Sequence, residues 1–465
     1  MAENLYQSRI PVVPRSVKGR FRATKYAILF IAYGVYFLLP WLRWHRASGP
    51  DQAVFFDIVG RKFYLFDLVV FAQDIFWLAG ILIIGAFLLF YVTSVAGRVF
   101  CGYFCFQTLW TDVFILIERL VQGERNARIK LLNSPMNGEK FFKLFLTKLL
   151  WFLMAFLTGL AFTMYWGNAP DLLVQFMTGE APFPAYATTL FLTATTFVMA
   201  GLAREQVCTY MCPYARFQGV MFDQDTLTVA YDQKRGEAEH GRSKPSKGLI
   251  ALEDRHDKGY GECIDCGYCV QVCPTGIDIR NGMQYQCISC ALCIDACDTI
   301  MDSINYPRGL VRYSSENELH GSKRHWLKPK NLGYGLAILA VSALLVWSVT
   351  TRDLTQLSVS QIRQPLYVVL SDGRIQNRYE LKITNKSDQV QYYKMELEGL
   401  PGAELDMGHF ADLSLKMGES VQLHVQIKQD ATQKRQSQKK FSFVLQGTGP
   451  GSHPSVKHPA MFYQP

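Results

Sequence analysis

The chain has 465 residues, of which 49% are hydrophobic, and a formal net charge of +9 at pH 7. This length allows two or three domains. The charge does not indicate nucleic-acid binding, because no soluble segment carries a basic patch with interleaved aromatic residues.

Apolar residues gather in five stretches that we expect to cross a membrane as helices. Each is 17 to 22 residues long and free of charge, close to the roughly 20 residues that span a bilayer. The first begins too late, and lacks the small-residue site, to be a cleavable signal peptide. The fourth is rich in threonine, whose hydroxyls can bond to the helix backbone. The stretches are Tyr26–Leu42, Ile75–Ala96, Leu149–Trp166, Tyr186–Ala203 and Leu332–Thr350.

Basic residues predict the orientation of these spans, since loops rich in lysine and arginine stay in the cytoplasm. Six such residues precede Tyr26, eight lie in 98–148 and none lies in 167–185, whereas 43–74 has four basic and four acidic residues. We therefore expect a multi-pass protein of a bacterial inner membrane. Its N-terminus would be cytoplasmic and, after five crossings, its C-terminal region periplasmic. All twelve cysteines then fall on the reducing side.

Four cysteines form two C-x3-C pairs, each beginning five residues after a predicted span. Cys101 and Cys105 make the first pair, and Cys208 and Cys212 the second. On a helix this spacing puts both sulfurs of a pair on one face, about 5–6 Å apart. We interpret the pairs as a weak internal repeat that would bring four thiols together at the inner membrane face. Four such thiols suit copper as Cu(I), a third iron–sulfur cluster or a redox-active dithiol; simple packing of buried cysteines is the alternative.

The other eight cysteines form two runs with the spacing C-x2-C-x2-C-x3-C. In bacterial ferredoxins with this spacing, the fourth cysteine of each run ligates the other cluster. The alternatives are zinc, whose sites use two separated pairs, and disulfides. We predict two 4Fe–4S clusters, the first on Cys263, Cys266, Cys269 and Cys297, and the second on Cys287, Cys290, Cys293 and Cys273.

Small or turn-forming residues lie within these runs, among them Gly267, Gly276 and Ser289. We expect them to let backbone amides approach the sulfurs, where hydrogen bonds tune the potential.

Beyond Arg352 the pattern changes to alternating apolar and polar residues. Val421, Leu423, Val425 and Ile427 alternate with polar neighbours, and shorter runs separated by turn signals do the same. This spacing is typical of an antiparallel, Ig-like β-sandwich of about 100 residues.

The predicted fold class is therefore a multidomain protein with an α-helical membrane domain, a dicluster ferredoxin insert and a C-terminal β-sandwich. The expected parts are a cytoplasmic segment at 1–25, a membrane domain with four spans and the first pair at 26–203, a cytoplasmic segment with the second pair and the ferredoxin domain (about 260–306) at 204–331, a fifth span at 332–350, and a periplasmic β-domain at 352–465.

In this combination the chain resembles the accessory proteins of cbb3-type cytochrome c oxidase known as the CcoG, FixG or RdxA family. The resemblance covers essentially the whole chain, including Ala53–Asp57 and Arg61–Tyr64 before the second span, both pairs, both runs and the β-domain. The family motif C-x3-C-P is matched by Cys208, Cys212 and Pro213, whereas Phe106 follows the first pair. The membrane half is also similar to the NapH-type quinol-linked ferredoxins, which lack a large external β-domain.

The resemblance implies a copper-related redox role in oxidase assembly. It implies a cupric reductase that converts Cu(II) to Cu(I), with all four C-x3-C cysteines as the catalytic and copper-binding residues. Membrane lipid, an unnamed cytoplasmic electron donor, and oxidase assembly factors or copper chaperones are the expected partners. A quinol-linked electron conduit and a non-redox assembly scaffold with structural clusters are the alternatives.

Overall fold

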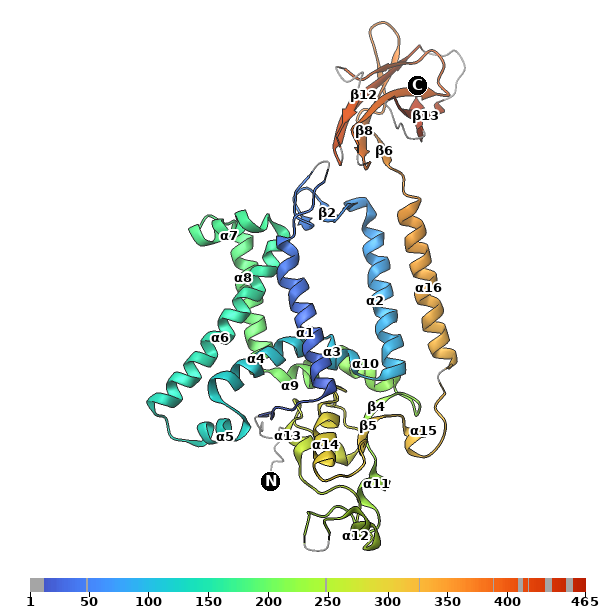
Figure 1. Ribbon diagram of the computed structural model, residues 1–465. Coiled ribbons are helices and arrows are strands. Elements are labelled where there is room, and N and C mark those ends of the chain that lie inside the picture. Colours follow the sequence, from blue (N-terminus) through green and yellow to red (C-terminus); the bar gives the residue numbers. More distant parts are fainter. Residues whose placement is uncertain are drawn as a thin grey trace, which may run out of the picture. The chain divides into compact units, whose positions relative to one another are not determined.

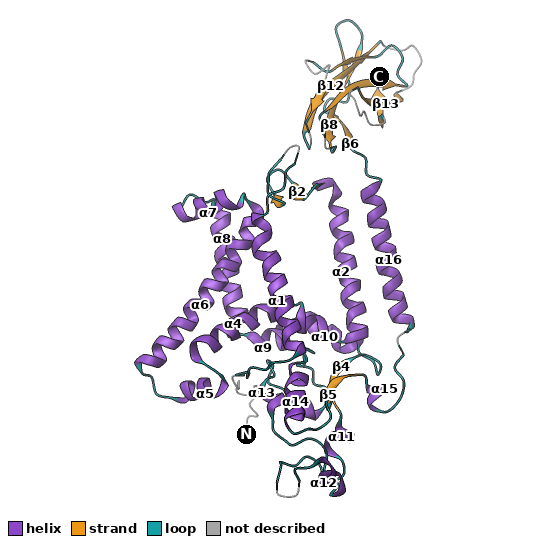
Figure 2. Ribbon diagram, viewed as in Figure 1, coloured by secondary structure: helices purple, strands orange, loops and turns teal. Residues whose placement is uncertain are grey.

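The structure, a computed structural model, divides into helices before residue 351 and strands after it, with short strands in two earlier loops (Figures 1 and 2). By internal contacts the chain forms two compact units, Met1–Leu42 with Gln73–Leu344 and Arg43–Ala72 with Leu345–Pro465. The structure describes residues 12–46, 49–246, 249–325, 327–387, 389–408, 413–416, 418–430, 437–448 and 455–465. Residues 1–11, which are part of the predicted cytoplasmic segment at 1–25, lie outside the described residues.

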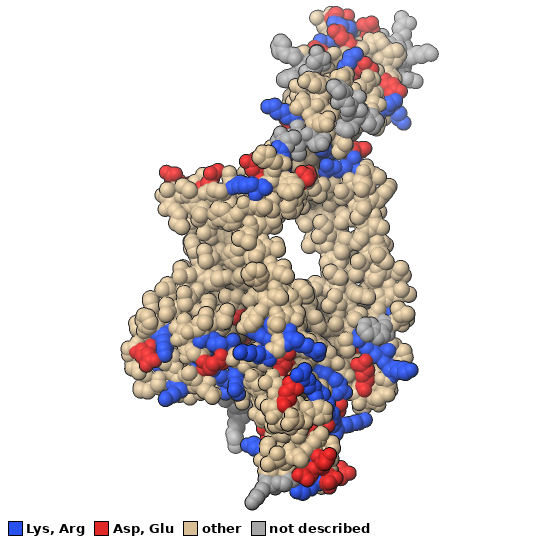
Figure 3. Space-filling view, viewed as in Figure 1, with Lys and Arg blue, Asp and Glu red and all other residues tan. Residues whose placement is uncertain are grey.

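All five predicted spans are helical, and within the described chain a further segment has the length and composition to cross a membrane. The surface over these helices is almost free of charged side chains (Figure 3). The six candidates are Arg20–Trp41, Ile75–Ala96, Val99–Gln122, Gly138–Trp166, Phe183–Leu202 and Pro329–Thr350. The helices that build them are α1 (Arg20–Leu38), α2 (Ile75–Ala96), α3 (Val99–Tyr103), α4 (Phe106–Gln122), α6 (Gly138–Thr163), α8 (Phe183–Thr196) and α16 (Pro329–Thr350).

The additional candidate, Val99–Gln122, escaped the sequence prediction because it carries charged residues. These charges are paired in the interior: Asp112 lies 2.9 Å from Lys25 Nζ, and Glu118 pairs with Arg128 and Arg204. Burial beside an opposite charge is what makes a charged group tolerable in an apolar helix bundle.

Helix α4 lies along one half of α6. The Trp110 indole donates to Thr158 at 2.8 Å, and the Gln122 amide donates to Thr147 at 2.8 Å. These two threonines are eleven residues apart, which is about 16 Å along a helix. The length of α6 that α4 contacts is therefore about half the thickness of a hydrocarbon core, which is about 30 Å. Near its start, the Gln107 amide also donates to the Arg204 carbonyl at 3.3 Å. Since Glu118, three turns later, binds the Arg204 side chain, α4 stays beside residue 204 along most of its length.

The cysteine runs lie in a small, mostly irregular segment between α8 and α16. Its helices are short because the chain turns around each run. A two-stranded antiparallel sheet, β4 (Thr228–Tyr231) with β5 (Val311–Ser314), closes this segment. The remaining helices of the chain are α5 (Arg125–Asn133), α7 (Ala169–Thr178), α9 (Arg204–Gln206), α10 (Pro213–Met221), α11 (Gln233–Glu237), α12 (Leu252–Asp257), α13 (Tyr268–Gln271), α14 (Leu292–Ser303) and α15 (Glu316–Leu319).

This segment contacts α1 through a helix cap and α16 through a cluster of ion pairs. The Asp295 carboxylate of α14 accepts hydrogen bonds from the backbone N–H groups of Phe21 (3.3 Å) and Arg22 (2.8 Å), and so caps the first turn of α1. Caps of this kind satisfy donors that a helix start leaves unpaired. Gly19 allows the approach, because a Cβ there would lie 2.2 Å from the Asp295 Cγ.

The second contact is a cluster of ion pairs at the start of α16. Asp223 pairs with Lys328 and Lys330, and Lys328 also reaches Asp225 at 3.3 Å. Burial acts to raise the pKa of Asp223, but the two lysines outweigh it and hold that pKa well below its usual range.

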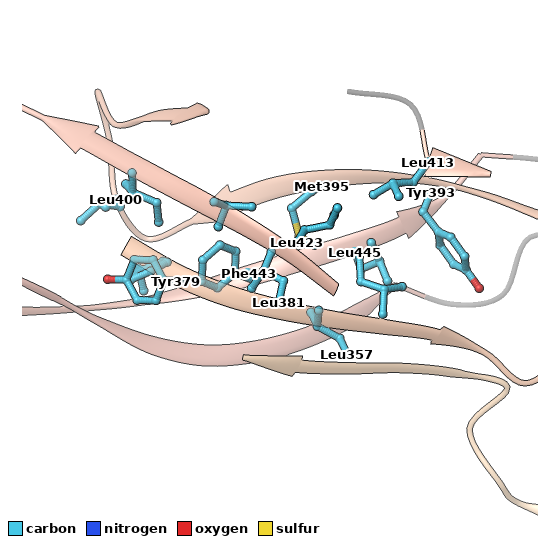
Figure 4. Packing of buried hydrophobic residues seen from close by; sticks show 14 of the residues in the cluster. Leu357, Tyr379, Leu381, Tyr393, Met395, Leu400, Leu413, Leu423, Phe443 and Leu445 are labelled. Carbon is cyan, nitrogen blue, oxygen red and sulfur yellow. The ribbon is translucent and has the colours of Figure 1, made fainter. Parts of the chain in front are cut away.

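The C-terminal strands form the predicted antiparallel, Ig-like sandwich. One sheet has the order β10-β12-β8-β6, with β7 added to β8, and the other has the order β11-β9-β13-β14. The alternation read from the sequence is confirmed, since Leu423, Val425 and Ile427 are buried. Figure 4 shows side chains of both sheets meeting in one core. The strands are β6 (Thr355–Gln361), β7 (Val368–Val369), β8 (Ile375–Asn385), β9 (Gln391–Glu398), β10 (Glu404–Asp406), β11 (Leu413–Leu415), β12 (Ser420–Gln429), β13 (Gln438–Gly447) and β14 (Val456–Tyr463).

The loop after α1 forms a sheet of its own, β1 (Val54–Asp57), β2 (Lys62–Leu65) and β3 (Leu68–Phe71). It belongs to the same compact unit as the sandwich. The Arg352 guanidinium donates to the Val69 carbonyl at 3.3 Å, and Lys386 Nζ lies 5.5 Å from the Phe71 ring centroid.

Candidate redox site

The two cysteine runs adopt the same backbone conformation. The second residue after the first cysteine has a positive φ in both, Asp265 at 50° and Ser289 at 52°. So does the residue after the second cysteine, Gly267 at 66° and Ala291 at 60°. Residues other than glycine avoid this region at a cost of about 1–2 kcal/mol. Positive φ values at equivalent positions of both runs indicate loops that turn their backbone amides inward, as in anion-binding nests.

The cysteines of the two runs line two cavities. Cys263, Cys266, Cys269 and Cys297 line one cavity. The other is lined by Cys273, Cys287, Cys290 and Cys293, and Cys269 also lines it; the rest of both linings is mainly apolar. Cys297 thus shares a cavity with the first run and Cys273 with the second.

One thiol of the first set, Cys266, is exposed, whereas Cys263 and Cys269 of the same set and Cys290 of the other are buried. Burial raises the pKa of Cys290 to about 12, opposed by the positive charge of Lys25. Burial likewise raises the pKa of Cys269 to about 12. Thiols in these surroundings keep their protons unless a metal ion replaces the proton, as iron does when a thiolate ligates it. Eight thiols in two apolar pockets therefore fit a pair of 4Fe–4S clusters.

The first C-x3-C pair is docked directly onto the second run. A Cβ on Gly102 would lie 2.7 Å from the Ile288 carbonyl oxygen and 2.9 Å from the Cys290 Cα, so only glycine lets the two backbones come this close. The neighbouring Tyr103 hydroxyl donates to the Cys290 carbonyl at 3.1 Å. Cys101 packs into the same apolar cluster as Cys290.

Arg98 and Tyr313 hold the same loop from two sides. The Arg98 guanidinium donates to the carbonyls of Tyr285 and Ala215, each at 2.5 Å, and so joins the second run to α10. The Tyr313 hydroxyl of β5 donates to the Ser289 carbonyl at 2.5 Å.

Each pair crosses a break between two helices, which corrects the expectation of one continuous helix face. Cys101 lies in α3, and Cys105, with φ −66° and ψ 125°, is extended and precedes α4. Cys208 lies in a π-helical turn, and Cys212, with φ −78° and ψ 112°, precedes α10. Pro213 explains the second break, since proline disfavours helical geometry in the residue before it. The first break has the same shape with phenylalanine in that place.

The four thiols of the pairs lie near one another. Burial raises the pKa of Cys208 to about 12, and the thiols of Cys105, Cys101 and Cys212 raise it further. The Cys101 thiol donates to Gln218 Oε1 at 3.4 Å. Gln218 is fully buried, and its Nε2 has no hydrogen-bond partner among the residues that the structure describes. Within the same residues, no group of three or more His, Cys, Asp or Glu side chains is placed to hold a single metal ion.

Comparison with known proteins places the site in a family. Residues 203–316 match a 4Fe-4S dicluster domain, and residues 345–465 match the IG-like fold at the C-terminal of FixG. Protein RdxB of Cereibacter sphaeroides is 43% identical over 405 residues, covering 85% of this chain and 83% of the relative. Protein RdxA of the same organism is 40% identical, covering 86% and 85%. The chain belongs to the FixG/RdxA family.

The family also includes the nitrogen fixation protein FixG of Rhizobium meliloti, 35% identical over 436 residues and covering 86% of this chain and 82% of the relative. A crystal structure of a FixG-related protein from Vibrio parahaemolyticus matches 24% of this chain and 98% of its own, at 21% identity and a TM-score of 0.22. This FixG/RdxA member is thus a membrane protein with an iron–sulfur dicluster domain.

Sequence reasoning on this FixG/RdxA member missed the residues that hold the thiols in place. Gln218 and Tyr313 carry no motif, and they reach the site from α10 and β5. Gly102 lies inside the first pair and gave a usable signal, since a glycine inside a short helix often marks a close backbone approach.

Proposed function

We propose that this protein carries electrons across its ferredoxin segment to the four C-x3-C thiols and reduces Cu(II) to Cu(I) there. The observation that carries the proposal is the backbone contact between Gly102 and the second cysteine run. It puts Cys101 into the apolar cluster that contains Cys290 and Cys293. A redox-inert pair would not need this approach.

The proposed ligands of one 4Fe–4S cluster are Cys263, Cys266, Cys269 and Cys297, and those of the other are Cys273, Cys287, Cys290 and Cys293. When bound, each cluster accepts and releases one electron at a time. The exposed Cys266 gives a cytoplasmic donor access to the first ligand set. The buried Cys290 of the second set contacts α3, so the protein contacts of this set lead toward the C-x3-C thiols.

Copper is the substrate in this proposal. Soft thiolate ligands favour Cu(I) over Cu(II), so a thiol pair that binds Cu(II) makes its one-electron reduction more favourable. Gln218 accepts a hydrogen bond from the Cys101 thiol and so orients that sulfur.

The proposed orientation keeps the ferredoxin segment in the cytoplasm and the β-sandwich in the periplasm of a bacterial inner membrane. Basic residues before Tyr26 and in 98–148 support it. The position of α4 beside Arg204 supports five crossings, because α4 then does not carry the chain across. We propose that the sandwich docks an assembly factor or copper chaperone of a cbb3-type oxidase.

The test compares the wild type with a Cys208→Ser/Cys212→Ser variant after anaerobic purification. Both should retain about eight irons per chain. After reduction with dithionite and removal of its excess, the wild type should consume the EPR signal of added Cu(II) and oxidise its clusters, whereas the variant should reduce copper slowly. Equal rates would show that these thiols are not the reaction centre.

A cavity among the helices favours a second candidate function, electron exchange with a membrane quinone. It has a volume of about 320 Å3 and is lined by aromatic and hydroxyl side chains of α1, α4, α6 and α8, including Tyr36, Trp110 and Thr158. Phe106, the residue after Cys105, also lines it. Reoxidation of the reduced Cys208→Ser/Cys212→Ser variant by a water-soluble quinone analogue, with copper absent, would favour this function, and no reoxidation would argue against it.

A further inference from the structure

A further cavity, of about 390 Å3, lies where α4, α5 and α6 meet residues 201–205. Three cationic side chains, Arg128, Lys148 and Arg204, line it together with two anionic ones, Glu118 and Glu205. One positive charge is therefore left uncompensated in its wall. The cavity is separate from the thiols and clusters of the proposed redox site.

Arg128 is the best indication that the cavity receives an anion. It is 4% exposed, and one of its terminal nitrogens pairs with Glu118. Its Nε is buried and has no hydrogen-bond partner in the described ranges. Leaving a buried donor of a charged group unpaired is costly. Burial lowers the pKa of Arg128, and the nearby Arg204 lowers it further against the opposing effect of Glu118, which also reflects a site short of negative charge.

Lys148 supplies the second donor. Its ammonium group lies 3.7 Å from the centroid of the Trp151 ring, and it forms no ion pair with the part of the chain that the structure describes. Glu118 is already shared between Arg128 and Arg204. The cavity therefore offers an ammonium group and a guanidinium edge, and its three cationic side chains outnumber its two carboxylates, Glu118 and Glu205.

We propose that this cavity binds the phosphate group of an anionic phospholipid. A phosphate has only acceptor oxygens under these conditions, which matches unpaired arginine and lysine donors. Leu132 and Leu144, which also line the cavity, suit the glycerol and first methylenes of a lipid better than a free ion. Lys148 belongs to the candidate span Gly138–Trp166, and basic pockets between spans near one membrane surface attract anionic headgroups.

The site has a consequence for the second C-x3-C pair. Arg204 stands between two π-helical segments, Phe197–Leu202 and Val207–Met211, and Cys208 lies in the second. Such irregular turns are frequent at functional sites. Because Arg204 lines this cavity, a lipid phosphate bound in the cavity restrains the segment that positions Cys208.

The test titrates the full chain, purified in detergent, with phosphatidylglycerol, phosphatidylcholine or inorganic phosphate, and counts bound lipid by native mass spectrometry. Lys148→Gln removes one donor and Lys143→Gln is the matched control, since Lys143 lies on the same helix in an exposed pair with Glu139. Wild type and control should bind phosphatidylglycerol in preference to phosphatidylcholine. Lys148→Gln should bind it about fivefold more weakly.

Equal binding by the two variants would overturn the proposal, as would equal binding of both lipids. If inorganic phosphate at millimolar concentration competes with phosphatidylglycerol, the site binds free phosphate, and the proposal of a lipid ligand is overturned. If Lys148→Gln loses iron, Leu144→Trp replaces it. That variant fills the cavity without changing its charge, and it must also weaken phosphatidylglycerol binding.

Discussion

Replacing Gly102 by alanine should loosen the contact between the first C-x3-C pair and the second cysteine run. The new Cβ would lie 2.7 Å from the Ile288 carbonyl oxygen, and ordinary contact begins near 3.4 Å, so one backbone must move by about 0.7 Å. Overpacking of this kind costs about 1–3 kcal/mol. The gain in helix propensity is about 1 kcal/mol. Because the three nearest obstructing atoms, Ile288 O and the Cys290 Cα and N, all belong to backbone, we expect a net loss of about 1–2 kcal/mol.

Hydrogen exchange measures this loss where it arises. Amides in 285–293 should exchange about 5–30 times faster in Gly102→Ala, the factor that corresponds to 1–2 kcal/mol. Copper reduction should slow, while the iron content stays at that of the wild type. Gly85→Ala in α2 is the control, because no atom lies within 4 Å of its added Cβ. Unchanged exchange in 285–293 together with wild-type copper reduction would refute the argument from close approach.

Three further changes test other parts of the site. Cys297→Ser should lower iron from about eight to about four atoms per chain, measured by metal analysis, and full retention would reject the exchange of fourth ligands between runs. Glu118→Gln should destabilise the protein by about 3–5 kcal/mol, because it leaves the buried Arg128 and the partly buried Arg204 without their shared charged partner; thermal unfolding checks this, with the exposed Glu139→Gln expected to unfold like wild type. Asp223 has a lowered pKa in the folded protein, so its ion pairs stabilise the start of α16 above the unfolded pKa of about 4 and lose that effect as pH falls through the lower folded value. Asp223→Asn should give faster proteolysis around residue 325 at pH 7 and remove that pH dependence, whereas a pH profile like that of the wild type would contradict this role.

Local patterns predicted the parts of the protein that are built locally. The five uncharged stretches became helices because length and apolarity alone decide a span, and the alternation of Leu423, Val425 and Ile427 became one face of a strand because side chains alternate along it. The spacing also predicts that Cys273 and Cys297 ligate the clusters of the opposite runs, and each lines a cavity with thiols of the opposite run. These features depend on a few neighbours in sequence.

Features built from distant residues were not predictable in this way. Asp112 and Glu118 make α4 look unlike a membrane helix, and only their partners from α1, α5 and α9 explain why they are buried. The helix breaks at Cys105 and Cys212 were missed because i, i+4 spacing fits a helix equally well. The grouping of 43–72 with the sandwich joins segments almost 300 residues apart.

The cap that Asp295 places on α1 bears on the order in which the protein is made. Helix α1 is among the first elements to leave the ribosome, yet the carboxylate that completes its first turn is synthesised more than 270 residues later. Asp295 lies between Cys293 and Cys297, in a helix whose position depends on the folded cysteine runs. The first turn of α1 therefore receives this cap only after the iron–sulfur segment has been made and has folded, which couples the start of the first span to the folding of the cysteine runs.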